Sequence, residues 1–330
     1  FLAVEIEQVD SFILERTNAN RITNRIEVQS LWSGYGGIER VVLEGADYPS
    51  VVVKHVQPGR GSHPRGWNTD LSHQRKLKSY QVETNWYDSQ KNNAGDNLAR
   101  IPVCFGIQRE GDEVFLILED LDASGFAGRR SLVNQSEWKS CVRWLAAFHT
   151  QYLGVAPKGL WENGTYWHLE TRPDELERLN DHSLKKAASA IDAKLKTNKF
   201  QTLVHGDAKL ANFCFSSNGS EVAAVDFQYV GGGCGMKDLA YFVGSCFPDE
   251  DAEKIEVEVL DYYFNQLGEC LEKIESRFLK EEIEGDWRPL YPVAWADFHR
   301  FMKGWSPGHW KLSDYSERVT RKVIESLEGM

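Results

Sequence analysis

Alternating apolar and polar positions recur in the first third of the chain and predict a small, mostly antiparallel β-sheet. Within this part, residues 75–90 space their apolar side chains at helical intervals and predict one long helix. Residues 57–73 combine several Pro and Gly with Arg and His, so they predict a basic loop without regular structure. The strand-like segments are residues 26–30, 39–43, 51–54, 103–108 and 114–118.

After Leu121 the pattern becomes mainly helical. Residues 136–153 form the clearest amphipathic stretch, with a start expected near Ser136, and residues 174–195 and 252–279 read as further helices. Residues 202–230 interrupt these helices with short apolar strands and tight turns. The pattern therefore predicts an α+β chain whose first part is a sheet with one helix and whose larger second part is helical.

The composition excludes several classes of protein. The chain has 330 residues, of which 42% are hydrophobic, which is enough for a sizeable core. Its 49 acidic residues outnumber 38 basic ones, and the net charge of −11 disfavours binding to nucleic acids and to anionic membranes. No segment reaches the roughly 20 apolar residues of a membrane-spanning helix, and the first residues do not resemble a signal peptide. Six cysteines without a C-x-x-C pair predict reduced thiols in a cytoplasmic protein.

Polar residues that suit phosphoryl transfer follow two short strands in the second part of the chain. Residues 202–213 lead an apolar strand into a turn that presents Asp207, and Asn212 follows five residues later. A second apolar strand ends at Asp226. Transfer of a phosphoryl group from a nucleotide needs a carboxylate that accepts the proton of the attacking hydroxyl, and an Asp with an Asn that hold magnesium. An isolated Asp-x-x-x-x-Asn is more often simple turn chemistry, because both residues are common in turns.

Two residues in the first part of the chain strengthen the kinase interpretation. Lys54 ends a buried-looking strand, where an ammonium group is costly unless an anion accompanies it. Glu83 lies in the helix that follows. Together with the three residues above, these five positions occur in the order that a kinase-like site requires.

The chain resembles the aminoglycoside phosphotransferase and choline kinase-like group of small-molecule kinases, and within it the ecdysteroid kinase-like branch. The resemblance extends over residues 28–315 and rests on three motifs. It implies a two-lobed protein-kinase-like fold, with residues 1–121 as the nucleotide-binding lobe and residues 122–330 as the catalytic and acceptor-binding lobe. The motifs are His205-Gly-Asp-Ala-Lys-Leu-Ala-Asn212, Val225-Asp-Phe-Gln228 and Gly-Gly-Gly-Cys-Gly-Met-Lys-Asp238-Leu-Ala-Tyr241.

The resemblance also implies a role for each of these residues. Asp207 corresponds to the catalytic base, and Asn212 and Asp226 correspond to the Mg²⁺ ligands. Lys54 corresponds to the lysine that binds the α- and β-phosphates of ATP, and Glu83 to its partner on the helix. We expect these two side chains to form an ion pair within about 4 Å.

Further expectations concern the nucleotide and the acceptor. The resemblance assigns Glu119, Asp120 and Leu121 to the hinge that reads adenine, and the C-terminal Asp297 and Trp305 to the acceptor site. The turn with Gly34, Gly36 and Gly37 is a candidate phosphate loop, although it carries Glu39 in place of a last glycine and an ordinary hairpin would also explain it. We expect the basic loop to cover the phosphates, and the acceptor pocket to have apolar walls with few polar contacts.

Three other polar residues are interpreted as structural rather than as reacting groups. We expect His149 to be a hydrogen-bonded core histidine and His205 to hold the catalytic turn through its ring nitrogens. Asp238 is interpreted either as a helix N-cap or, following the resemblance, as a brace of the catalytic loop.

The predicted function is transfer of the γ-phosphate of ATP to a hydroxyl group of a small molecule, such as a hydrophobic alcohol, an amino alcohol or a sugar. A protein kinase is disfavoured because Phe227-Gln228 follows Asp226 and no Ala-Pro-Glu occurs downstream. A nucleotide-binding pseudokinase scaffold is the alternative from another class. The acceptor, a preference for ATP or GTP and the oligomeric state are left open.

Overall fold

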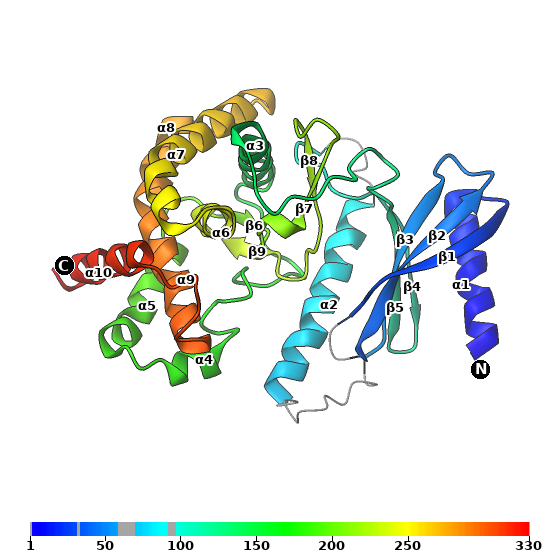
Figure 1. Cartoon of the computed structure of the whole chain (residues 1–330), viewed down its shortest axis with the longest axis horizontal. Coiled ribbons are helices and arrows are strands. Elements are labelled where there is room, and N and C mark those ends of the chain that lie inside the picture. The colour runs from blue at the N-terminus through cyan, green and yellow to red at the C-terminus, as the bar shows by residue number, and fades with distance from the viewer. Residues whose placement is uncertain (1, 32–33, 59–69, 92–96, 330) are drawn as a thin grey trace.

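The computed structural model describes residues 2–31, 34–58, 70–91 and 97–329. A five-stranded sheet forms one end of the molecule and a larger helical part forms the other, as the sequence predicts (Figure 1). Helix α2 (Asp70–Gln90) lies between them and borders both. The part of the predicted loop at residues 59–69 lies outside the described residues, whereas residues 70–73, also assigned to that loop, belong to the first turn of α2.

The sheet is antiparallel throughout and has the strand order β1-β2-β3-β5-β4. All five predicted strands are present, each longer than the apolar run that indicated it. The strands are β1 (Arg21–Ser30), β2 (Gly36–Glu44), β3 (Ser50–Val56), β4 (Cys104–Glu110) and β5 (Glu113–Glu119).

An N-terminal helix that the sequence analysis did not predict, α1 (Leu2–Thr17), covers the outer face of the sheet. Its buried Val9 and Ile13 join a cluster with Val41 and Val51 of the sheet. Because only this narrow apolar stripe is buried, the helix has no strong pattern of its own until the sheet supplies its partner.

Side-chain alternation along β3 positions the candidate lysine. Val51 and Val53 point to the outer face and pack in the cluster beneath α1. Val52 and Lys54 point to the opposite face and line the cleft toward the helical part. Since β3 pairs with β2 on one side and β5 on the other, Lys54 is held in the centre of the sheet.

The helical part contains eight α-helices among the described residues. The predicted helix at 174–195 is wrong as a single element, because Asp181 accepts a hydrogen bond from Leu184 N and caps a new helix there. The predicted helix at 252–279 ends earlier, at Lys273. The α-helices are α3 (Gln135–Gln151), α4 (Pro173–Arg178), α5 (His182–Lys196), α6 (Met236–Cys246), α7 (Asp249–Lys273), α8 (Lys280–Trp287), α9 (Tyr291–Trp305) and α10 (Asp314–Glu328).

The start of α3 also differs from the expectation. Its N-cap is Asn134, whose side chain accepts from Glu137 N at 2.9 Å. The Glu137 carboxylate in turn accepts from Asn134 N at 3.1 Å, which completes a capping box. The helix therefore begins at Gln135, one residue before the predicted start at Ser136.

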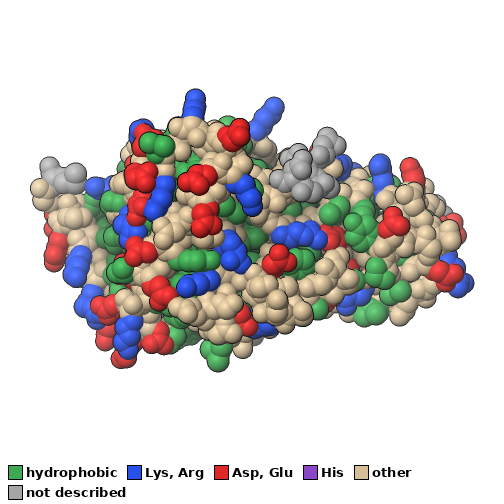
Figure 2. Space-filling model, turned by 90° about the horizontal axis from the view of Figure 1, so that it is seen from above, with side chains coloured by type: hydrophobic (Ala, Val, Ile, Leu, Met, Phe, Trp, Pro, Cys, Tyr) green, Lys and Arg blue, Asp and Glu red, His purple; other side chains and the backbone are tan. Residues whose placement is uncertain are grey.

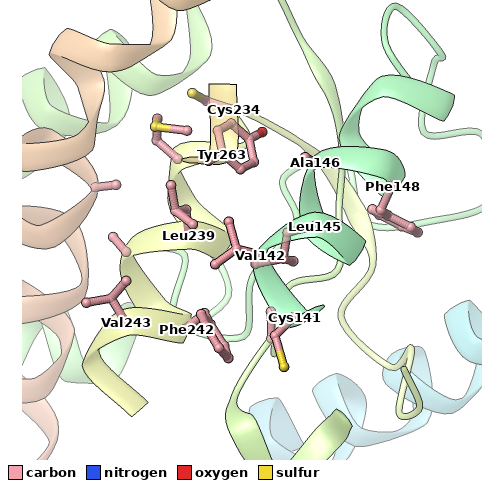
Figure 3. Close-up of a cluster of buried hydrophobic side chains, with 14 of the residues drawn as sticks. Cys141, Val142, Leu145, Ala146, Phe148, Cys234, Leu239, Phe242, Val243 and Tyr263 are labelled. Carbon is pink, nitrogen blue, oxygen red and sulfur yellow. The ribbon is translucent and has the colours of Figure 1, made fainter. Parts of the chain in front are cut away.

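The main core lies behind the short strands of residues 202–230. Figure 3 shows Val142 and Leu145 of α3 directed toward Leu239 of α6, and all three side chains are fully buried. This packing gives the catalytic segment a close-packed support. The short strands are β6 (Thr202–Val204), β7 (Phe213–Phe215), β8 (Val222–Ala224) and β9 (Gly231–Gly233), with 3₁₀ turns η2 (Leu210–Asn212) and η3 (Arg288–Leu290).

Surface and composition features complete the description. In the part of the chain that the structure describes, no helix has the length and apolarity needed to cross a membrane. All six cysteines are free. Acidic and basic side chains are interspersed over the face displayed in Figure 2, without a broad patch of one sign.

Candidate active site

A cleft of about 620 Å³ separates the sheet from the helical part. Residues from both parts line it, including Lys54 and Glu83 on one side and Asp207, Asn212 and Asp226 on the other. The five polar positions singled out in the sequence thus meet in one cavity, although they come from widely separated segments.

Lys54 and Glu83 form a buried ion pair across the cleft wall. Lys54 Nζ of β3 lies 2.5 Å from Glu83 Oε2 of α2, and both residues are almost fully buried. Burial raises the pKa of Glu83, and the Lys54 charge opposes this increase. The ion pair expected from the sequence is therefore present. Its position on the cleft wall would let the ammonium group meet an anion in the cavity.

The backbone at Gly206 presents Asp207 to the cleft. Strand β6 ends at Val204, and Gly206 adopts a φ of +83°. A Cβ atom at Gly206 would lie 2.1 Å from the carbonyl oxygen of Tyr229, so only glycine fits this close approach. The turn is thus sharp enough to aim the Asp207 side chain into the cavity.

Asp238 braces this turn from beneath. Its carboxylate accepts hydrogen bonds from His205 N at 2.7 Å and Gly206 N at 3.0 Å. His149 Nε2 lies 2.8 Å from the same carboxylate, and His149 Nδ1 lies 2.7 Å from the Tyr263 hydroxyl. Burial opposes the charged form of Asp238, but the hydrogen bond and charge interaction with His149 lower its pKa. Asp238 is the expected brace and not a helix N-cap, which is Gly235 here.

The imidazole of His205 connects the turn to the neighbouring strand. Nε2 lies 2.9 Å from Val225 O, and Nδ1 accepts from Asp207 N at 3.2 Å. Burial lowers the pKa of His205, so the ring is neutral and can donate from one nitrogen while accepting at the other. His149 is therefore the hydrogen-bonded core histidine and His205 holds the catalytic turn, as the sequence predicted.

The carboxylate of Asp207 has an electrostatic environment that suits a base. Tyr241 Oη donates to its Oδ1 at 2.9 Å, and Asn212 Nδ2 donates to its Oδ2 at 3.3 Å. Burial raises the pKa of Asp207 to about 7, and repulsion from Asp226 contributes to the increase. Lys209 and the two hydrogen bonds act in the opposite direction. A carboxyl group with a pKa near neutrality can both accept and release a proton under physiological conditions.

Asn212 and Asp226 fit a magnesium site that uses few protein ligands. Asn212 Nδ2 donates to Asp207 O at 2.8 Å, so its Oδ1 remains the atom that can bind a cation. Asp226 follows β8 with a φ of +66°, which turns its carboxylate into the same cavity. Mg²⁺ commonly takes one or two protein oxygens together with substrate phosphates and water. Among the described residues, no group of three or more His, Cys, Asp or Glu side chains forms a denser metal site.

Sequence reasoning missed three residues around this centre. Lys209, inside the catalytic motif, places Nζ 3.8 Å from Asp207 Oδ2. Lys76 of α2 lines the cleft, and its pKa is lowered mainly by burial. Tyr241 lies in the third motif, but only the fold brings its hydroxyl to Asp207. The motif positions of Lys209 and Tyr241 were the available signals.

The predicted hinge lines the cleft, but two of its side chains are occupied elsewhere. Glu119 forms an ion pair with Arg100 and accepts from Val103 N at 2.9 Å. Asp120 accepts from Arg40 Nε at 2.6 Å and from Ser50 Oγ at 2.6 Å. These contacts hold the segment in place, so adenine recognition by Glu119, Asp120 and Leu121 stays a prediction about the backbone.

The glycine-bearing turn is only partly described. Gly34 and Gly36 have positive φ angles of +75° and +123°. A Cβ atom at Gly36 would lie 2.0 Å from His55 O, so the close approach of β3 already requires this glycine. A hairpin explains that requirement, and phosphate binding by Gly34, Gly36 and Gly37 stays a prediction.

The two candidate acceptor residues differ in position. Asp297 is almost fully buried, and its Oδ1 accepts from Arg300 Nη2 at 3.0 Å, away from the residues that line the cleft. Trp305 is half exposed and stacks on Phe301 with centroids 6.0 Å apart. The geometry therefore favours Trp305 over Asp297 as a residue that a ligand can reach.

A model of the ecdysteroid kinase-like family matches residues 70–156 and 161–276, which is more than half of the chain. The chain belongs to the ecdysteroid kinase-like family. This membership confirms the resemblance found in the sequence, with its kinase-like fold, and makes the chain a small-molecule kinase. The matched residues include Glu83, Asp207, Asn212 and Asp226, whereas Lys54 lies outside them.

Several solved structures are similar over nearly the whole chain. A microcompartment-associated aminopropanol kinase has 15% identity and a TM-score of 0.49, covering 99% of this chain and 94% of that chain. A choline kinase from Streptococcus pneumoniae has 13% identity and a TM-score of 0.46, covering 99% of both chains. An aminoglycoside phosphotransferase in a ternary complex with ADP and hygromycin B has 8% identity and a TM-score of 0.46, covering 98% and 99%. The search of curated proteins found no match.

Proposed function

We propose that this member of the ecdysteroid kinase-like family transfers the γ-phosphate of ATP to a hydroxyl group of a small molecule. The observation that carries the proposal is the shared cleft. The buried Lys54–Glu83 ion pair lines the same cavity as Asp207, Asn212 and Asp226. A cation held against one wall and carboxylates against the other match what phosphoryl transfer requires.

In the proposed reaction each side chain has a distinct task. Lys54, oriented by Glu83, binds the α- and β-phosphates of the nucleotide. Asp207 accepts a hydrogen bond from the acceptor hydroxyl and takes its proton as the oxygen attacks phosphorus. Tyr241 and the Asp238 brace keep the Asp207 carboxylate in place before the acceptor arrives.

Asn212 and Asp226 would hold Mg²⁺. When bound, the ion would neutralise the negative charge that develops on the transferred phosphoryl group. Lys209, only 3.8 Å from Asp207, is placed to attract the same group from the acceptor side.

An ATP turnover assay tests the proposal. The purified chain is incubated with Mg-ATP and a panel of sterols, amino alcohols and sugars, and ADP release and phosphorylated product are measured. Asp207→Asn, which keeps the size of the side chain, is the matched variant and should lower turnover by about 10²–10⁴-fold while leaving ATP affinity nearly unchanged.

Other outcomes identify the rival functions. Binding of Mg-ATP without acceptor-dependent ADP release, equal in both proteins, would show a pseudokinase scaffold. Transfer to protein substrates with no small-molecule product would show a protein kinase.

A further inference from the structure

A cluster of aromatic rings packs beside Asp207. Tyr241 donates to Asp207, and the Tyr166 hydroxyl lies 3.3 Å from the Tyr241 hydroxyl. The Tyr166 ring packs edge-on against Phe301 of α9 at 5.6 Å, and Trp305 stacks on Phe301 in turn. A chain of aromatic contacts therefore runs from the proposed base to the end of α9, where Trp305 is half exposed while Tyr241 and Phe301 are buried.

Lys311 lies over this cluster of aromatic rings. Its Nζ lies 5.6 Å from the ring centroid of Tyr241, 5.8 Å from that of Phe298 and 5.6 Å from that of Trp310. The same Tyr241 donates its hydroxyl hydrogen bond to Asp207. Among the described carboxylates, none forms an ion pair with Lys311 within 4.0 Å. Burial lowers the pKa of Lys311, repulsion from Lys209 adds to this effect, and the charge of Asp207 opposes it.

A second cation lies over the same group of aromatic rings. Arg172 lies over the rings of Tyr166 and Phe301 at 5.8 and 5.5 Å, although it also pairs with Glu175. These aromatic rings therefore lie beside positive charge, and an acceptor pocket with apolar walls and few polar contacts stays a prediction. The net charge of the whole chain does not decide the matter, since both signs are interspersed over the face that Figure 2 displays.

We infer that Lys311 is a specificity-determining residue that selects acceptors by charge, favouring hydroxyl compounds with an apolar body and a carboxylate or similar oxyanion, and rejecting ammonium compounds. This inference rests on the proposed function. An oxyanion would provide the direct ion-pair partner that no described carboxylate gives to Lys311, and the exposed rings of Trp305 and Trp310 would contact the apolar body. An amine would instead bring a second positive charge to a partly buried ammonium group.

Three benzyl alcohols that differ only in charge test the inference. They are 4-(hydroxymethyl)benzoate, 4-(hydroxymethyl)benzylamine and benzyl alcohol. Binding to the full chain with Mg²⁺ and AMP-PNP is measured by calorimetry, and KM is measured from ADP release. A charge-assisted hydrogen bond to Lys311 should make the benzoate bind about 10–100-fold more tightly than the benzylamine.

Substitutions separate a charge effect from a structural one. Lys311→Gln should reduce the ratio of benzoate to benzylamine affinity about tenfold or more while changing benzyl alcohol little, and Lys311→Arg should restore the ratio. Lys139→Gln is the matched control, because Lys139 also lies over two rings, 5.6 Å from Trp138 and 5.2 Å from Tyr262, but on the α3 surface that packs against α7. It should leave the ratio unchanged.

Failure of the inference and failure of the proposed function give different results. Three results would overturn the inference. They are equal binding of benzoate and benzylamine, an unchanged affinity ratio in Lys311→Gln, and no binding of any probe at 10 mM, which is roughly tenfold above a Kd of about 1 mM. Phosphorylation of the benzylamine as efficiently as the benzoate would overturn the inference but leave the kinase function standing. Preferential benzoate binding that depends on Lys311, without ADP release, would support the charge selection and contradict the proposed transfer.

Discussion

Replacing Asp207 by Asn should stabilise the nucleotide-free protein, and the gain should grow with pH. In the folded chain, burial raises the pKa of Asp207 from its ordinary value of 3.8 to about 7, with repulsion from Asp226 as the next cause. The protonated carboxyl is therefore favoured on folding. That contribution is fully present below about pH 3.8 and is lost as the pH rises through about 7. Asn cannot ionise, so the variant avoids the loss.

The size of the effect follows from the difference between the two pKa values. Each unit corresponds to about 1.4 kcal/mol, so the ionised Asp207 costs about 4 kcal/mol of folding free energy once the pH exceeds 7. At pH 5 the cost is about 2 kcal/mol, because the unfolded chain is already mostly ionised while the folded chain is not. The stability difference between variant and wild type should therefore rise by about 2–3 kcal/mol between pH 5 and pH 8.

Urea unfolding followed by tryptophan fluorescence, in EDTA and without nucleotide, measures this difference at each pH. Changed hydrogen bonds to Tyr241 and Asn212 add a constant offset that cancels between the two pH values. Asp112→Asn, in the exposed turn between β4 and β5, serves as a control and should show no such rise. A difference that stays constant from pH 5 to pH 8, or that falls, would refute the assigned environment of Asp207.

Three other variants test the remaining parts of the site. Asp226→Ala should abolish the Mg²⁺-dependent part of ATP affinity, and equal calorimetric affinities with and without the substitution would contradict the metal assignment. Lys54→Met should destabilise the chain by about 3–5 kcal/mol in urea unfolding, because it leaves Glu83 buried without its partner. Adding Glu83→Leu should recover most of this loss. No recovery would contradict the interpretation that the two side chains depend only on each other. Trp305→Ala should raise the KM of the acceptor and spare that of ATP, and equal effects on both would contradict an acceptor contact at Trp305.

Features of the fold and the site that depend on residues close together in the sequence could be predicted from the sequence. The alternation in β3 places Val52 and Lys54 on one face, so the position of the lysine follows from the pattern of side chains alone. The catalytic motif contains its own glycine, and Gly206 is required wherever that turn forms. Family resemblance then supplied Glu83 as the partner of Lys54, which the geometry bears out.

Features created by tertiary packing were not predictable. Helix α1 gains its apolar partner only when the sheet forms, and the helix expected at 174–195 is interrupted by the cap at Asp181, which also pairs with Lys303 and Arg321. The hydroxyl of Tyr241 reaches Asp207 from a residue 34 positions away. A pKa near 7 likewise depends on the burial of Asp207, which no local pattern encodes.

Phe227 connects helix α2 with the catalytic turn, although Gln228 follows it here in place of the glycine found in protein kinases. It directly follows Asp226 and is fully buried. Its ring stacks on Trp86 of α2 with centroids 5.0 Å apart and packs against His205 at 4.7 Å. Trp86 lies three residues after Glu83 on the same helix, so one aromatic contact connects the ion pair, the proposed metal ligand and the catalytic turn. This connection is made by the aromatic ring of Phe227. Gln228 does not take part in it and instead contacts α2 through Ser79 and Lys76.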